Sequence, residues 1–305
     1  MDLVGPGAGR MSAAAKITAA GTVPAVVAGL CDDAAVFPPG LVPLPEAVRA
    51  HQGRHDRWYA GLVGPLVLAK AALPRLGPLV QPDLPLRLSV TLPGGPAGLP
   101  GVFGAVATLP VELSSVEVVV PEGMGAIEFS ERLADALAGG PELDVYVEVP
   151  RDARRAEIID GLQGRYRAKF RTGGVRAELY PSVEELAASI NAVLRAGIPF
   201  KATAGLHHAL RNTDPETGFV QHGFLNLLLA TEALLTGGSE ADAAALLAER
   251  DGATVAARIR AMDGLAVRHA RAAFTSFGTC SVTEPLAELI DLGIIIDHPE
   301  GEASQ

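Results

Sequence analysis

The chain has 305 residues but only two cysteines, Cys31 and Cys280. Two cysteines are too few for a disulfide framework, and the sequence has neither a CxxC motif nor a Cys/His spacing typical of a metal site. We therefore expect a cytoplasmic protein. The N-terminal segment is rich in Ala and Val, but Pro24 interrupts its apolar run, and Leu30 stands where a lipoprotein cleavage site has a small residue. We accordingly expect no signal peptide.

Long apolar runs are also missing, because none approaches the roughly 20 residues that a helix needs to cross a bilayer. Charged residues make up only 20% of the chain, and acidic residues outnumber basic ones 35 to 25, which gives a net charge of −10. A surface of this sign disfavours nucleic acid and anionic membranes as partners. Hydrophobic residues, at 49%, suffice for one large core, and we predict one domain.

Strand-like and helix-like segments alternate along most of the chain, and connections that contain helices imply a parallel sheet with right-handed crossovers. No Gly-rich dinucleotide motif follows the first strand, which disfavours a Rossmann fold. The number of strands favours an α/β fold of the (β/α)8 TIM-like barrel type or a close variant. The predicted strands are residues 62–69, 86–92, 115–121, 143–150, 167–172, 199–204 and 272–278, with one more near 101–109.

Two regions depart from this alternation. Residues 1–60 are predicted to form an N-terminal cap that packs on the barrel, and residues 61–297 form the barrel itself. The stretch 221–262 reads as a helical insertion, and its strongly apolar start is expected to shield the pocket or to mediate contacts in a homodimer. Residues 298–305 are expected to form a flexible tail.

Two lysines lie near the ends of neighbouring predicted strands, Lys169 in the sequence KFRTGG and Lys201 in the sequence KATAG. Because side chains alternate between the faces of a strand, Lys169 shares a side with Arg171, and Lys201 shares a side with Thr203. If the two strands are parallel neighbours, three cations converge on one small space. Such cations must be desolvated or paired, so they do not gather there for stability. The sequence therefore predicts an anion-binding pocket.

Chemistry at this pocket would depend on a lysine that loses its proton easily. Burial and like charge both disfavour an ammonium group, so Lys169 is expected to lower the pKa of Lys201, which then acts as a base or forms an imine. Arg171 offers a planar fork for a carboxylate or phosphate. In the alternative interpretation, each lysine pairs with Glu148 or another interior carboxylate and only links the layers of the barrel.

The loops after the strands add further candidates. Both lysine strands end at glycine, where backbone can approach a ligand closely, and the amides of residues 279–281 can bind an anion at a helix start. Cys280 can be a nucleophile, although a single cysteine in a turn is more often inert. The expected substrate-binding residues are Arg171, Thr172, Gly173, Gly174, Thr203, His222, Asn226, Cys280 and Ser281.

Histidines follow the fourth strand of the central region directly, as His207 and His208, while His222 precedes an apolar helix that carries Asn226 one turn later. One of them is a candidate proton shuttle because histidine titrates near neutrality. The alternative is a helix cap or a histidine bonded to a loop carbonyl. We expect no metal site, since adjacent histidines point apart and no HxH or HExxH motif is present.

Two more pairs are given structural interpretations. His51 and His55 lie four residues apart on a predicted helix and are expected at the surface. Asp32 and Asp33 can act as paired carboxylates in acid–base chemistry, but a pair at a helix end before a Pro-Pro turn is the interpretation we favour.

Two resemblances to known protein families add to these predictions. The sequence KATAG, which begins at Lys201, resembles Schiff-base aldolases of the deoxyribose-phosphate type, in which a second lysine stands on an adjacent strand, as Lys169 can here. That resemblance implies a covalent role for Lys201. Over most of its length the chain resembles a bacterial protein family of undefined activity, through the segments DDAAVFPPG (32–40), KFRTGG (169–174), FKATAGLHH (200–208), HGFLN (222–226) and TCSVTEP (279–285).

These observations together predict a barrel enzyme, a lyase of the aldolase type or an isomerase, that acts on a small anionic carbonyl compound without a cofactor. The alternatives are a metal-dependent hydrolase that uses the histidines with Glu148, and a ligand-binding barrel without catalysis. A small anionic metabolite is the expected partner. The expected catalytic residues are Lys201, Lys169, His207, His208 and Glu148.

Overall fold

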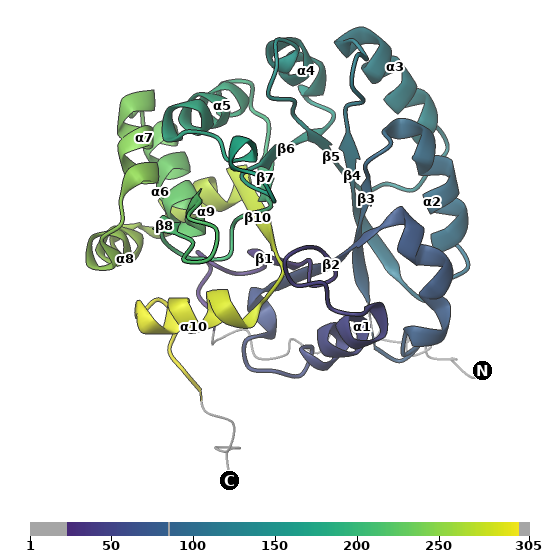
Figure 1. Cartoon of the computed structure of the whole chain (residues 1–305), viewed down its shortest axis with the longest axis horizontal. Coiled ribbons are helices and arrows are strands. Elements are labelled where there is room, and N and C mark those ends of the chain that lie inside the picture. The colour runs from purple at the N-terminus through teal and green to yellow at the C-terminus, as the bar shows by residue number, and fades with distance from the viewer. Residues whose placement is uncertain (1–22, 85, 299–305) are drawn as a thin grey trace, which may run out of the picture.

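Eight parallel strands close into a barrel in the computed structural model, which describes residues 23–84 and 86–298 (Figure 1). The strands follow the order β1-β10-β7-β6-β5-β4-β3-β2 around the barrel, and all neighbours pair in parallel. This arrangement confirms the predicted (β/α)8 barrel. The strands are β1 (Cys31–Asp33), β2 (Val63–Ala69), β3 (Arg87–Leu92), β4 (Glu112–Val119), β5 (Asp144–Glu148), β6 (Arg167–Arg171), β7 (Phe200–Thr203) and β10 (Phe274–Thr279).

Helices surround this barrel, as Figure 1 shows. The start of α5 is capped, because the Ser182 side chain accepts a hydrogen bond from the backbone N–H of Glu185. Within the described residues, no helix is long and apolar enough to cross a membrane. The helices are α1 (Leu44–Gly53), α2 (Leu99–Val106), α3 (Ala126–Leu137), α4 (Arg155–Leu162), α5 (Val183–Arg195), α6 (Phe224–Leu235), α7 (Glu240–Ala248), α8 (Gly252–Ala261), α9 (Gly264–Ala273) and α10 (Thr283–Asp291).

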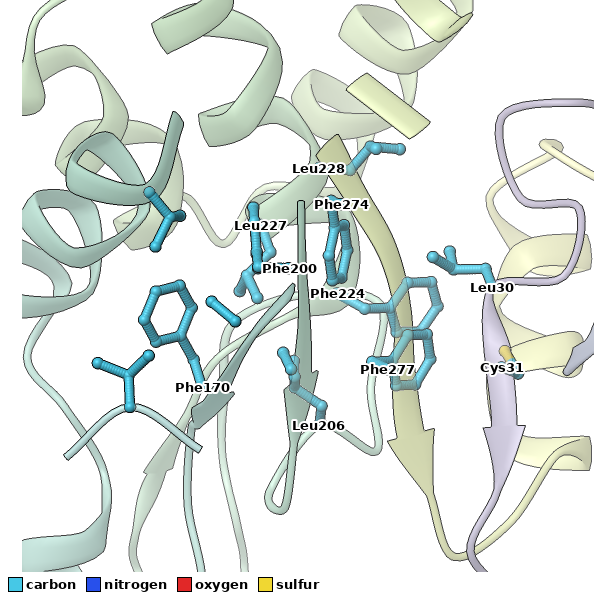
Figure 2. Close-up of a cluster of buried hydrophobic side chains, with 14 of the residues drawn as sticks. Leu30, Cys31, Phe170, Phe200, Leu206, Phe224, Leu227, Leu228, Phe274 and Phe277 are labelled. Atoms are coloured by element: carbon cyan, nitrogen blue, oxygen red, sulfur yellow. The ribbon is translucent and has the colours of Figure 1, made fainter. Parts of the chain in front are cut away.

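The hydrophobic core beside β7 and β10 lies between the outer face of the barrel and α6 (Figure 2). Phe200 of β7 stacks on Phe274 of β10 with ring centroids 5.2 Å apart, and Phe277 stacks on Phe224 of α6 at 4.5 Å. Such pairs contribute beyond the area they bury. Because strand side chains alternate, large apolar residues on the outer face leave the inner face free for other side chains.

The insertion predicted at 221–262 is helical, and α6, α7 and α8 occupy it. A two-stranded antiparallel hairpin, β8 (Asn212–Thr213) with β9 (Val220–Gln221), precedes these helices. Figure 1 shows α6 to α9 stacked on one flank of the barrel, beside β7 and β10. All but the last four residues of α6 are buried, so the apolar stretch of this helix packs within the chain.

Two predictions about the fold were wrong. Residues 101–109 were expected to form a strand, but most of them belong to α2, which starts at Leu99. Residues 31–33 were assigned to an N-terminal cap, yet they form β1, which pairs with β2 and β10 and closes the barrel. Residues 1–22 of that expected cap and most of the expected tail lie outside the described residues.

Candidate functional site

Six charged side chains, which we call the interior charge chain, alternate in sign through the inside of the barrel. Lys201 lies at the deep end, with its Nζ 2.5 Å from Oδ2 of Asp32 and 2.6 Å from Oε1 of Glu117. The other oxygen of Glu117, Oε2, lies 2.8 Å from Nζ of Lys169, which also lies 3.0 Å from Oε2 of Glu148. Glu148 then approaches Arg171, whose Nε is 3.5 Å away. The charges of the three cations and the three carboxylates therefore cancel.

Strand geometry explains how these groups meet. Lys169 of β6 and Lys201 of β7 are register partners in adjacent parallel strands, as are Glu148 and Lys169 in β5 and β6. Partners at the same level point to the same face, so the predicted convergence of two lysines and Arg171 inside one barrel is confirmed in its geometry. The carboxylate between them, Glu117 of β4, was not predicted.

Burial decreases along the interior charge chain toward the carboxyl ends of the strands, the end that we call the barrel mouth. The side chain of Lys201 is 1% exposed and that of Lys169 is 7% exposed. Glu148 is 18% exposed and Arg171 is 39% exposed. Lys169 therefore lies closer to solvent than Lys201, below a rim formed by Glu148 and Arg171.

The ionisation of the two lysines differs from the prediction. Burial by itself lowers the pKa of Lys201, but the carboxylates of Asp32 and Glu117 outweigh burial, and this pKa is raised above its ordinary value. The pKa of Lys169 is raised in the same way, against burial, by Glu117 and Glu148. The expected lowering of the Lys201 pKa was therefore wrong, because carboxylates separate the two ammonium groups.

The carboxylates of the chain are not equivalent. Burial raises the pKa of Asp32, and Lys201 offsets this effect only in part. Burial also acts on Glu117, but its two lysine partners outweigh it and hold the pKa of this group well below its usual range. The pKa of Glu148 is likewise lowered, against burial, by Lys169 and Arg171. Asp32 is therefore the carboxylate most ready to accept a proton.

Hydroxyl groups complete the surroundings of the two deepest carboxylates. Ser89 donates to Oε1 of Glu117 at 3.0 Å, and Ser115 donates to Ser89 at 2.8 Å. Ser276 donates to Oδ2 of Asp32 at 2.8 Å. These neutral donors hold the carboxylates in place without changing the charge balance, a support that buried ion pairs need.

Two glycine-containing loops meet at the mouth, after β6 and β7. Thr172 donates a hydrogen bond to the carbonyl oxygen of Ala204 at 2.7 Å, and a Cβ on Gly173 would come within 2.9 Å of the Cα of Gly205. Ala204 has a φ of 64°, a left-handed conformation that costs about 1–2 kcal/mol for a residue with a Cβ.

In the described part of the chain, the glycine amides of these loops lack hydrogen-bond partners, although Gly173 and Gly205 are buried. Among residues 23–84 and 86–298, the backbone N–H groups of Gly173, Gly174 and Gly205 have no hydrogen-bond acceptor. The Arg171 guanidinium reaches the same place, because its Nη1 donates to the carbonyl oxygen of Gly173 at 3.1 Å. Free amides beside a guanidinium can bind an anion.

The predicted histidines do not form one cluster. Nδ1 of His207 lies 3.2 Å from Sγ of Cys280, and burial lowers the pKa of this histidine. Nδ1 of His208 lies 2.5 Å from Oε1 of Glu288 in α10, and this contact raises the pKa of His208. The two neighbours therefore point to different partners, as expected for adjacent residues.

His222 and Asn226 have structural partners. Nε2 of His222 donates to the Pro181 carbonyl oxygen at 2.8 Å, and burial lowers its pKa to about 4, so the ring is neutral near pH 7. The Asn226 amide donates to the carbonyl oxygens of Leu246 and Glu249. The hydrogen bonds of these two residues tie α6 to neighbouring segments, and none reaches a lysine of the interior charge chain.

Two further predictions were wrong, one for the Asp32–Asp33 pair and one for His51. The two aspartates lie in a strand rather than at a helix end, and they point to opposite faces of it. Asp33 faces outward, with its Oδ2 2.6 Å from Nη1 of Arg54 and 3.0 Å from Nδ1 of His51. His51 is thus paired and largely buried, whereas His55 is exposed as expected.

No group of three or more His, Cys, Asp or Glu residues within the described part of the chain is arranged to hold a metal ion. Fold and site together define a (β/α)8 barrel whose interior carries a balanced set of acids and bases. No protein-family model matches the sequence of this chain, and a search of curated proteins finds no match to it.

Proposed function

We propose that this barrel is a lyase or isomerase that acts on a small anionic carbonyl compound through its strand-end lysines. The observation that carries the proposal is the interior charge chain itself. A barrel interior packed with hydrophobic residues is often as stable as one with buried ion pairs, or more so, so six charged groups at its centre are poor evidence for a purely structural role. Acids and bases with displaced pKa values mark candidate catalytic sites.

Lys169 is the better candidate for the nucleophile, which reverses the roles suggested by the sequence. Its side chain is the more exposed of the two, at 7%, whereas that of Lys201 is 1% exposed and enclosed between Asp32 and Glu117. A neutral Lys169 amine adds to the carbonyl carbon of the substrate, and the carbonyl oxygen leaves as water when the imine forms. The positive imine then stabilises electrons released at the adjacent carbon, by C–C cleavage or by removal of a proton.

The hydrogen-bonded path through the barrel offers a way to neutralise Lys169 before this step. Its proton passes to Glu117 over the 2.8 Å contact, and Lys201 hands one of its own protons to Asp32 over the 2.5 Å contact. Lys201 recovers a proton from Glu117 across 2.6 Å. The net result is a neutral Lys169 and a protonated Asp32, the carboxylate whose pKa is already raised.

Groups at the mouth serve the remaining needs of the reaction. Glu148, 3.0 Å from Lys169, is placed to move protons to and from the carbinolamine. Arg171 and the free amides of Gly173 and Gly174 bind the anionic group of the substrate. His207, beside Cys280 at the same end of the barrel, is a second candidate proton carrier.

Borohydride trapping tests the imine directly. The protein is incubated with a panel of small aldehydes and keto acids that carry a phosphate or carboxylate, reduced with borohydride, and digested for mass spectrometry. We expect a reduced adduct on Lys169 with at least one compound, and a Lys169→Met variant should lose it. The exposed Lys70 serves as the internal control for nonspecific labelling.

The outcomes separate the candidate functions. Labelling of Lys169 and Lys70 to the same low extent would count against imine chemistry. Deuterium exchange at the carbon next to a substrate carbonyl, without any trapped adduct, would instead point to direct proton abstraction and an isomerase. Binding of these compounds with neither result would leave the ligand-binding barrel as the better description.

A further inference from the structure

A second group of charged side chains, two arginines and two carboxylates, lies away from the interior charge chain, around a pocket of about 350 Å³. Its walls come from three places in the chain: the segment after β7, the loop before α8, and the second half of α10. Figure 1 shows α8 and α10 on the same flank of the molecule as the β8 hairpin. The lining residues are His208, Leu210, Arg211, Asn212, Arg250, Glu288, Asp291 and Leu292.

The two arginines of this pocket are not paired with carboxylates. In the part of the chain that the structure describes, neither Arg211 nor Arg250 forms an ion pair. Nη1 of Arg211 lies 3.2 Å from Nδ1 of the neutral His222, which occupies one of its five N–H groups. Arg250 is exposed, and within the described residues its guanidinium contacts only the Thr213 hydroxyl, at 3.3 Å from two of its nitrogens. Most of the N–H donors therefore remain available.

The positive charge of Arg250 also disfavours the charged form of Arg211. Burial lowers the pKa of Arg211, and the charge of Arg250 lowers it further, while Glu184 has a smaller and opposite effect. Two like charges held near each other beside a cavity, without a bridging carboxylate, favour a bound anion that bridges them.

Within the described residues, the two carboxylates of the lining form no ion pair with the arginines. Glu288 is occupied by the neighbouring segment, because it contacts His208 and accepts a hydrogen bond from the backbone N–H of Ala209. Asp291 is the other carboxylate, and it is placed on the α10 wall. A ligand that carries an anionic group and a hydroxyl group can bind the two arginines through the first and Asp291 through the second.

The apolar part of the wall is closely packed. Leu210 and Leu292 both lie against Gly252, where an added Cβ would come within 3.1 Å of each side chain. The first residue of α8 is thus held against the segment after β7 and the end of α10, so the chain segments that carry Arg211 and Arg250 lie next to each other. A pocket of this volume accommodates a small metabolite.

We infer that this pocket is a binding site for a small phosphate ester that carries hydroxyl groups, with Arg211 and Arg250 as the phosphate ligands and Asp291 as a hydroxyl acceptor. Two guanidinium groups match a dianionic phosphate in charge and in geometry. The site is separate from the lysines of the barrel and does not depend on the imine chemistry.

Isothermal titration calorimetry with ribose 5-phosphate and with inorganic phosphate tests the site. The titrations use the full chain carrying Arg171→Gln, so that the mouth of the barrel contributes as little as possible. In this background we expect one binding event for ribose 5-phosphate, and Arg250→Gln should weaken it by about tenfold or more, because a charge-assisted bidentate contact is lost. Arg211→Gln should have a similar effect.

The matched control is Arg258→Gln, which removes the same charge from an exposed position of α8 outside the pocket. We expect it to leave the affinity within about twofold. Equal weakening by Arg258→Gln and Arg250→Gln would show a diffuse electrostatic effect and overturn the proposal, and so would the absence of any binding in the Arg171→Gln background. Circular dichroism spectra show whether each variant is folded. If Arg211→Gln unfolds, Arg250→Gln alone decides the result.

Discussion

The two faces of the same strands behave in opposite ways. On the inner face of β6 and β7, Lys169 and Lys201 take part in a balanced chain of buried charges. On the outer face of β7, Phe200 is buried under an aromatic stack with Phe274. The outer face supplies apolar burial, the main source of stability, while the inner face contains groups whose burial is costly. A barrel can therefore keep its core outside its strands and its chemistry inside.

The largest change in the free energy of unfolding is expected when one cation of the inner face is removed. Lys201→Met leaves Asp32 and Glu117 as adjacent buried carboxylates without their shared partner. Breaking a buried pair in this way costs about 3–5 kcal/mol, and the loss of two pairs places the effect at the upper end. Chemical denaturation measures it. Lys70→Met, at an exposed position, should change the unfolding free energy little.

A double variant sharpens this prediction. Asp32→Asn combined with Lys201→Met removes one of the stranded negative charges, so the double variant should be more stable than Lys201→Met alone. If the two substitutions simply add, the coupling between Asp32 and Lys201 is small, and the description of the interior charge chain as one unit is wrong.

A slightly smaller change is expected on the outer face. Phe277→Ala removes a ring that stacks on Phe224 of α6 at 4.5 Å and leaves a cavity, at a cost of about 3–5 kcal/mol. Phe277→Leu should cost less. At a temperature where the variant stays folded, borohydride trapping at Lys169 should persist, because Phe277 faces away from the lysines. Loss of trapping in a folded Phe277→Ala variant would break the separation between the two faces.

The smallest change in the free energy of unfolding is expected when the pH is lowered. The pKa values of Glu117 and Glu148 are lowered in the folded state, so in moderate acid the unfolded chain binds protons that the folded chain does not. Stability from these groups is present above their unfolded pKa of about 4.3 and is lost as the pH falls toward their folded values. The raised pKa of Asp32 works in the opposite direction.

Denaturation curves at several pH values check this expectation. Between pH 5 and pH 4, the two glutamates together should lower the unfolding free energy by about 1 kcal/mol. The Glu148→Gln variant should show a shallower pH dependence over this range, because one of the contributing carboxylates is gone. An unchanged slope in that variant would mean that Glu148 contributes nothing to the linkage.

Local patterns were enough to predict the barrel and the inward direction of Lys169, Arg171 and Lys201, because a period of two is a property of each strand alone. Their partners were harder to find. Asp32 is 169 positions from Lys201 in the sequence, and Glu117 is 84 positions away, so both contacts depend on strand order and register across the closed barrel.

One signal for Glu117 was nevertheless present. It is the only charged residue of the predicted strand 115–121, and a charged residue in such an apolar segment is rarely buried without a partner. For β1 the signal was weaker, since three residues are too few to show a period. The pKa of Lys201 was predicted in the wrong direction because its carboxylate partners were not predicted. The direction of the shift depends on whether a carboxylate or a second ammonium group lies nearest to the lysine.

The balance of three cations and three carboxylates limits how the barrel can exchange protons with its surroundings. At the deep end, the Tyr146 ring lies 5.2 Å from Nζ of Lys201, and its hydroxyl is hydrogen-bonded to Thr275 at 3.0 Å. Exchange with bulk water is therefore expected through Glu148 and Arg171, the most exposed members of the set. The barrel interior thus holds a fixed number of exchangeable protons, and a ligand bound at Glu148 and Arg171 is expected to slow their exchange with water.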